Sequence, residues 1–71
     1  MSVAAIGEPE QIAGYGLAGV ALFPASDPAG VLAAWATLPN DTVLVIVSRS
    51  ASAVLASRLV ERDVVWVEVP E

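Results

Sequence analysis

The chain of 71 residues contains no cysteine and no histidine. Without cysteine it can form no disulfide, no thiolate metal site and no thiol nucleophile. Without histidine it lacks the side chain that most often serves as a general base near neutral pH, and its serines have no histidine to activate them. We therefore expect a protein that is not an enzyme, with no catalytic residue, no cofactor and no metal site.

Lysine is also missing, and the positive charge rests on three arginines against eight acidic residues, for a formal net charge of −5. Binding to a phosphate backbone depends on clustered cations. We therefore do not expect nucleic acid as a partner.

The apolar runs of the sequence are too short to span a membrane. The run at residues 43–47 is far below the about 20 residues that a membrane-spanning helix needs, and Pro24, Asp27 and Pro28 divide the next candidate. The amino terminus has no basic segment, and Glu8 interrupts it before a long apolar core develops. We expect a cytoplasmic protein that reaches a membrane only through a larger complex.

What the chain does have is an excess of apolar side chains. Its length allows one domain, residues 1–71, and a domain of this size buries only about 60% of its unfolded surface. Hydrophobic residues make up 56% of the sequence, which is high for a globular chain. Apolar surface should remain after one small core is filled, which favours a protein partner.

The hydrophobic pattern predicts four strands, at residues 3–6, 20–23, 42–47 and 64–69, alternating with three helices. A short helix opens at Pro9 and should bury Ile12, Ala13 and Leu17, with Tyr15 as a further candidate for its inner face. A second opens at Asp27-Pro28, and a third is expected to be capped by Ser50. The predicted inner faces of these two are Val31, Leu32, Trp35 and Leu38, and then Ala51, Val54, Leu55 and Leu59.

The order β-α-β-α-β-α-β predicts a small doubly wound α/β fold. Parallel strands joined by right-handed crossovers give a four-stranded sheet of order 2-1-3-4 with helices on both faces. In the last strand Val65, Val67 and Val69 should face one way, and Val64, Trp66 and Glu68 the other. A polar position in that strand indicates a half-exposed sheet edge.

Residues 14–19 (GYGLAG) match the glycine spacing of dinucleotide-binding folds. That fingerprint requires its glycines directly after the first strand, at the start of a helix, and an acid about 20 residues further on. Here the glycines follow a helix. We interpret the segment as a glycine-turned helix end that leads into the second strand.

Two polar positions follow predicted strands, where doubly wound folds place functional groups. Glu8 follows the first strand and Ser48 the third. Ser48, Arg49 and Ser50 precede a helix and form a candidate weak anion-binding site, although N-capping explains the same residues. A receiver-like or small ligand-binding regulatory domain is therefore an alternative, but one glutamate and no lysine do not supply a phosphoacceptor site. A third alternative is a self-assembling or structural module, which predicts a mass that depends on concentration.

Four residues are candidates for a partner interface. Tryptophan is enriched where protein surfaces meet, and Trp66 shares a strand face with Glu68. Tyr15 and Leu17 lie in the glycine-rich segment. Trp35 lies on a helical stripe and is expected in the core.

Several segments resemble the F-subunit family of the V-type and archaeal A-type rotary ATPases. They are residues 3–8 (VAAIGE), 14–20 (GYGLAGV), 43–48 (VLVIVS) and 67–70 (VEVP), which match that family's strand-Gly-acid start, its Leu-Ala-Gly segment, its hydrophobic strand and its Glu-Val-Pro-type ending. Two features depart from the family: the chain stops at Glu71, where members continue into a long helix, and residues 48–52 are not acidic.

The resemblance implies a function as well as a fold. It implies a Rossmann-like domain on the central stalk of a rotary ATPase, docked beside a D-like coiled-coil stalk subunit, with no active site of its own. Its role would lie in proton transport coupled to ATP synthesis or hydrolysis.

Overall fold

A computed structural model describes residues 2–61 and 64–69. The elements follow one another in the predicted alternation of strands and helices. They are β1 (Ser2–Gly7), α1 (Pro9–Ile12), the 3₁₀ helix η1 (Ala13–Ala18), β2 (Ala21–Pro24), α2 (Pro28–Ala36), β3 (Thr42–Val47), α3 (Arg49–Glu61) and β4 (Val65–Glu68).

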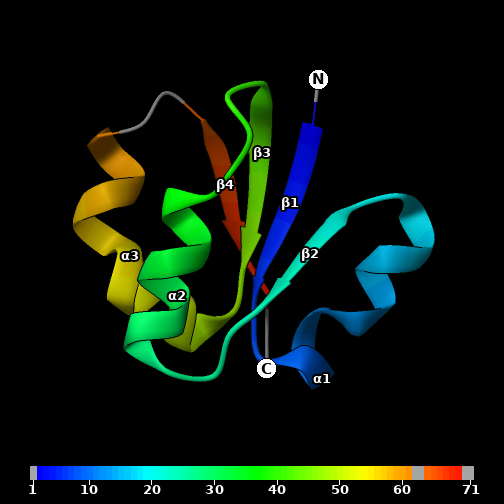
Figure 1. The fold of residues 1–71 in the computed structure, drawn as a ribbon, viewed down its shortest axis with the longest axis horizontal. Helices are drawn as coiled ribbons and strands as arrows, with labels where there is room; N and C mark the ends of the chain where they lie inside the picture. Colours follow the sequence, from blue (N-terminus) through cyan, green and yellow to red (C-terminus); the bar gives the residue numbers. More distant parts are fainter. Residues whose placement is uncertain (1, 62–63, 70–71) are drawn as a thin grey trace.

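The four strands form one parallel sheet of order β2-β1-β3-β4. Two layers of helices flank it, with α2 and α3 on one face and α1 with η1 on the other (Figure 1). These observations confirm the predicted doubly wound α/β fold. We call the side under α2 and α3 the first face, and the opposite side the second face.

The first face holds the main core. Cross-strand pairing places Ala4 beside Val45 and Ile6 beside Val47, so that these side chains share one face. Leu55 and Leu59 of α3 and Trp35 of α2 pack on them, and all are buried. The expectation that Trp35 lies in the core is confirmed.

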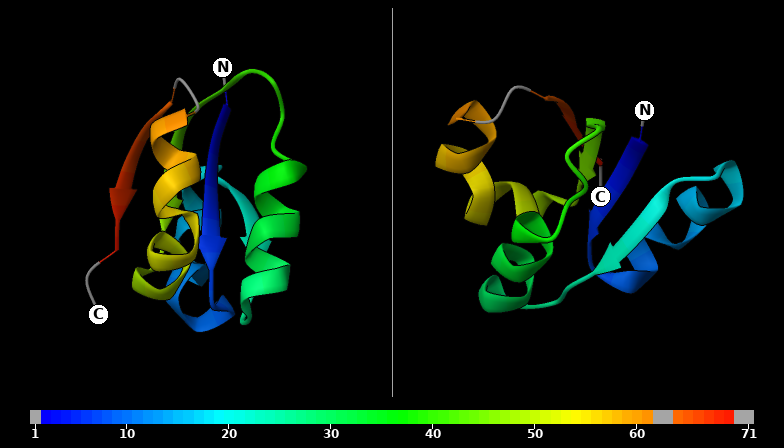
Figure 2. Two further views of the ribbon diagram at one scale, coloured as in Figure 1. Left: turned by 90° about the vertical axis from the view of Figure 1, so that its left-hand side faces the viewer. Right: turned by 45° about the horizontal axis from the view of Figure 1, so that its top comes forward.

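The second face is only half covered. Beneath α1 and η1, a small cluster buries Ala5, Ile12, Ile46 and Val69. The pairing also places four further apolar side chains on this face, across β1, β3 and β4, and none of them is buried. In Figure 2, α1 and η1 lie on the β1–β2 side of this face. We call these four side chains the open band. They are Val3 and Leu44, both half-buried, Val65, 65% exposed, and Val67, 47% exposed.

The first helix differs from the prediction. The α-helix ends at Ile12 and continues as the 3₁₀ helix η1, and Ala13 and Leu17, expected inside, are exposed, Leu17 by 95%. Glycines at three positions weaken the α-helix, and a 3₁₀ turn rotates side chains by a different angle per residue. The segment ends at Gly19, whose φ of +81° favours glycine.

Two helix starts were predicted with different success. Asp27 caps α2 by accepting a hydrogen bond from the Gly30 backbone N–H at 2.6 Å, as expected. The cap of α3 is Ser48 and not Ser50: the Ala51 N–H donates to Ser48 Oγ at 3.2 Å. Because Ser48 ends a buried strand, its hydroxyl already points at the first turn of α3.

The strand expected to begin at Val64 begins at Val65, and Pro70 and Arg62 lie outside the described residues.

Within residues 2–61 and 64–69, none of the helices combines the length and apolar character that crossing a bilayer requires.

Candidate functional site

Adjacent strands bring two predicted site residues together. β1 and β3 are neighbours in the sheet, and Glu8 and Ser48 directly follow their carboxyl ends. The Ser48 N–H donates to the Ile6 carbonyl at 3.0 Å and thus continues the ladder. Gly7 allows this close approach, because a Cβ at position 7 would lie 2.6 Å from the Ser48 Cβ.

Glu8 accepts hydrogen bonds from two serines. Ser48 Oγ donates to Glu8 Oε1 at 3.2 Å, and Ser50 Oγ donates to the same oxygen. Ser48 is 2% exposed, and its hydroxyl also caps α3. The carboxylate of Glu8 therefore lies at the N-terminal end of α3, where a negative charge interacts favourably with the helix dipole.

The predicted anion site and the predicted strand-end acid thus form a single hydrogen-bonded cluster. The hydroxyls of Ser48 and Ser50 are directed at Glu8, which is an anion supplied by the chain itself, and the third residue of the predicted site, Arg49, is exposed. The cluster joins β1 to α3. The hydrogen-bonded groups of the cluster are one carboxylate and two hydroxyls. No group of three or more potential metal ligands occurs among the described residues.

A small pocket adjoins this cluster between the start of α2 and the start of α3. Its volume is about 80 Å³, well below the about 300 Å³ at which typical ligand pockets begin. A few water molecules or a small ion would fill it. It is lined by Glu8, Ser26, Asp27, Pro28, Val31, Ser50 and Val54.

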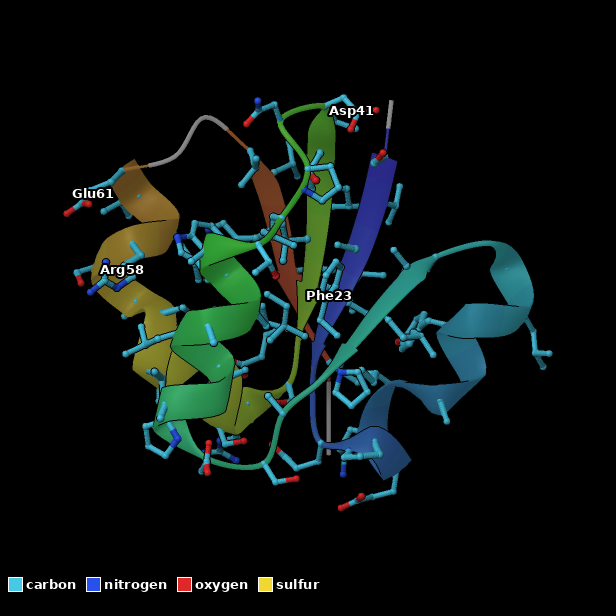
Figure 3. All side chains as sticks on the ribbon, in the orientation of Figure 1. Phe23, Asp41, Arg58 and Glu61 are labelled. Carbon is cyan, nitrogen blue, oxygen red and sulfur yellow. The ribbon has the colours of Figure 1, made fainter. Side chains whose placement is uncertain are left out.

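One carboxyl group elsewhere has a shifted pKa. The Ser2 hydroxyl donates to Asp41 Oδ1 at 3.0 Å, which lowers the pKa of Asp41. Asp41 is exposed and precedes β3, at the end of the sheet opposite Glu8 (Figure 3). Its shift therefore has no connection with the strand-end cluster.

The four predicted interface residues do not form one surface. Tyr15 is half-buried against the second-face cluster and Leu17 projects from η1, beside β2 at one edge of the sheet. Trp66, 39% exposed, and Glu68 belong to β4 at the other edge, and their pairing with Val45 and Val47 places them on the first face. The sheet order separates the two pairs.

The open band was missed by the sequence reasoning. The alternation of apolar residues in β4, with Val65 and Val67 on one face, could be seen in the sequence. The sequence does not show whether a helix covers that face, because this depends on the path of each connection between strands. The pairing Val3–Leu44–Val65 forms one row across three strands, and Ala5–Ile46–Val67 forms the next. A continuous uncharged strip results.

The glycine-rich segment lies away from the strand-end cluster. Glu8 alone separates β1 from α1, and residues 14–19 come only after α1, in η1 and its C-cap. The fold and this arrangement define a small doubly wound α/β domain whose strand ends carry no glycine-rich phosphate loop. No protein-family model, no curated protein and no solved structure matches the chain.

Proposed function

We propose that this chain is a non-catalytic protein-interaction subunit whose open band binds a helix of a partner protein. The observation that carries the proposal is the composition and exposure of that band. Its four side chains are apolar, and Val65 and Val67 expose 65% and 47% of their surface. Contiguous exposed apolar surface on a small soluble fold marks an interaction site.

A helix fits this strip better than another sheet does. Strands of parallel sheets are apolar on both faces because helices cover both, and β1 and β3 carry buried apolar residues on each face. On the second face, α1 and η1 already occupy the space over β2 and the carboxyl end of β1 (Figure 2). One further helix beside them would complete the layer.

The charge distribution favours a partner helix with basic flanks. None of the open-band residues is charged, and both arginines of the described residues, Arg49 and Arg58, belong to α3 on the first face. The chain as a whole carries a net charge of −5. Lysines or arginines beside an apolar stripe on the partner would therefore find complementary charge.

The resemblance to the F-subunit family makes a rotary ATPase the proposed assembly. In that setting the partner helix belongs to the D-like coiled-coil subunit of the stalk, and the chain takes part in proton transport without an active site. The Leu17-Ala18-Gly19 string and the sheet order 2-1-3-4 support this assignment.

Co-expression with the coiled-coil stalk subunit of the rotary ATPase from the same organism tests the proposal. We expect a complex that co-elutes in gel filtration and weakens as salt is raised. Leu44→Lys, in the open band, should abolish the complex, whereas Val60→Lys, on α3 at the other face, should leave it intact. Thermal melts of both variants establish that they are folded.

The absence of a complex, or equal loss in both variants, would contradict the proposal. The alternative of a ligand-binding or receiver-like domain rests on the pocket beside Glu8. Thermal shift with Mg²⁺, inorganic phosphate and nucleotides separates the two functions, because ligand binding raises the melting temperature. Flat curves are expected, and a clear rise would favour the alternative.

A further inference from the structure

The strand β4 exposes its free edge as well as its side chains. The Val69 N–H donates to the Val47 carbonyl of β3 at 2.7 Å. Since backbone groups of successive strand residues point to opposite sides, Val65 and Val67 also face β3. Trp66 and Glu68 then direct their N–H and C=O groups away from the sheet. All four residues of β4 are exposed.

This edge has few of the features that prevent strand pairing. Natural edge strands are protected by short length, charged side chains, proline, bulges or a covering element, and among the described residues no further strand pairs with β4. β4 (Val65–Glu68) contains no lysine and no proline, and Glu68 is its single charge. The other sheet edge differs: Pro24 ends β2, and η1 packs on it, with Gly16 directly above Leu22.

A ridge of α3 continues this surface on the first face. The buried stripe of α3 is Ala51, Leu55 and Leu59. Val54, which precedes Leu55 in the sequence, lines the pocket together with residues of α2, so the residues that precede the buried stripe lie on the α2 side of α3. The residues that follow the stripe in the sequence form a ridge on the opposite side of the helix, away from α2. Figure 2 shows α3 between α2 and β4, which places that ridge on the β4 side. It consists of Ser52, Ala56 and Val60, and Val60 is 79% exposed.

Of the three charged residues of α3, Arg49 lies at the start of the helix, three residues before Ser52 and so on the same side, whereas the other two lie off the ridge. Arg58 precedes Leu59 and thus lies on the α2 side, and it projects outward together with Glu61 (Figure 3). The β4 side of the molecule therefore presents a strand edge in the sheet layer and the ridge of Ser52, Ala56 and Val60 in the helix layer. A partner must offer a strand and a helix in the same relative position to cover both.

We propose that a second copy of this chain covers this surface, through antiparallel pairing of β4 with β4 of the partner copy. A two-fold axis perpendicular to the sheet brings both the edges and the α3 ridges together, because such an interface is the same patch on each protomer. With Trp66 opposite its own copy, the two indoles fill the space between the α3 helices. Glu68 then pairs with Val64 of the other copy and not with a like charge. The dimer does not depend on the proposed function.

Sedimentation equilibrium of the whole chain from micromolar to millimolar concentration tests this dimer. The mass should rise from 7.3 kDa towards twice that value. Glu68→Pro removes an N–H that faces the free edge and spares the pairing with β3, so this variant should remain monomeric. Glu68→Ala, which removes the same charge but keeps the N–H, should dimerise like the unaltered chain.

Two further variants keep the test decisive if Glu68→Pro unfolds. Val60→Lys should raise the dissociation constant at least about tenfold, because each copy would then carry a cation on the ridge that faces the other copy. Leu44→Lys, on the open band, should leave dimerisation unchanged. A monomeric mass at millimolar concentration would overturn the dimer, and so would loss of dimer in Leu44→Lys but not in Val60→Lys.

Discussion

The two faces of the sheet are built from the same strands but are covered very differently. The first face lies under helices of nine and thirteen residues, α2 and α3. The second lies under an α-helix of four residues and a 3₁₀ helix of six. Stability should therefore come from the first face, and the second is free for binding.

The strands themselves are suited to burial on both sides. β1 places Ala4 and Ile6 on the first face and Ala5 on the second, and β3 likewise places Val45 and Ile46 on opposite faces. Only the helices are unequal. The open band therefore exists because the helix layer on the second face is incomplete, and not because the strands are polar on that face.

Leu55→Ala and Leu44→Ala remove the same atoms from the two faces and should differ most. Leu55 is fully buried, and truncating a buried leucine costs about 2 to 5 kcal/mol. A chain of this length has a total stability of about 4 to 10 kcal/mol, so the loss removes a large part of it and the urea midpoint should fall steeply. Leu44 is half-buried, and its loss should cost about 1 kcal/mol. Urea denaturation followed by circular dichroism measures both, and equal costs would contradict the comparison.

Gly7→Ala should disturb the strand-end cluster that joins the first-face helix α3 to β1. The new Cβ would lie 2.6 Å from both Cβ and Oγ of Ser48, which is held by its capping bond. Overpacking of this kind costs about 1 to 3 kcal/mol. Gly14→Ala is the matched control on the second-face segment, since nothing lies within 4 Å of the added atom. Its midpoint in urea should not fall, and a shared loss would show that the cluster is not the cause.

Asp27→Ala should remove the N-cap of α2, the other first-face helix. The Asp27 carboxylate accepts the Gly30 N–H at 2.6 Å, and loss of such a cap costs about 1 kcal/mol. Asp27→Asn keeps an acceptor in place and should recover most of the loss. Thermal unfolding of the three proteins compares them, and no difference between alanine and asparagine would mean that the capping bond contributes nothing.

The fold was predictable because its local patterns agree with one another. The apolar runs at β1 and β3, the Asp27-Pro28 start of α2 and the alternation at β4 each indicate one element, and their order implies the topology. The first helix was not predictable in detail: Ile12 follows the helical pattern, whereas the glycines from Gly14 onward change the backbone to 3₁₀ geometry. Local propensity alone does not decide whether the segment stays α-helical or becomes a 3₁₀ helix.

The candidate sites were predictable as residues but not as arrangements. Glu8 and Ser48 were both expected at strand ends, and the order 2-1-3-4 makes those ends neighbours, yet the hydrogen bonds that turn the serines towards Glu8 needed side-chain positions. The open band could be predicted only from the complete backbone, because the exposure of Val65 depends on the path of α1 at the far edge of the sheet.

Val65→Thr should have the smallest effect and therefore tests most directly whether the open band is free in the isolated chain. Threonine keeps the β-branched shape that suits a strand, and at a site 65% exposed its hydroxyl can bind water, so stability should change by no more than about 0.5 kcal/mol. Val45→Thr, in the neighbouring strand β3 but fully buried on the first face, should cost about 1 to 3 kcal/mol because its hydroxyl loses water. Urea midpoints measure the difference. If Val65→Thr cost as much as Val45→Thr, another part of the chain would have to cover the open band, and the asymmetry between the two faces would no longer account for a binding surface.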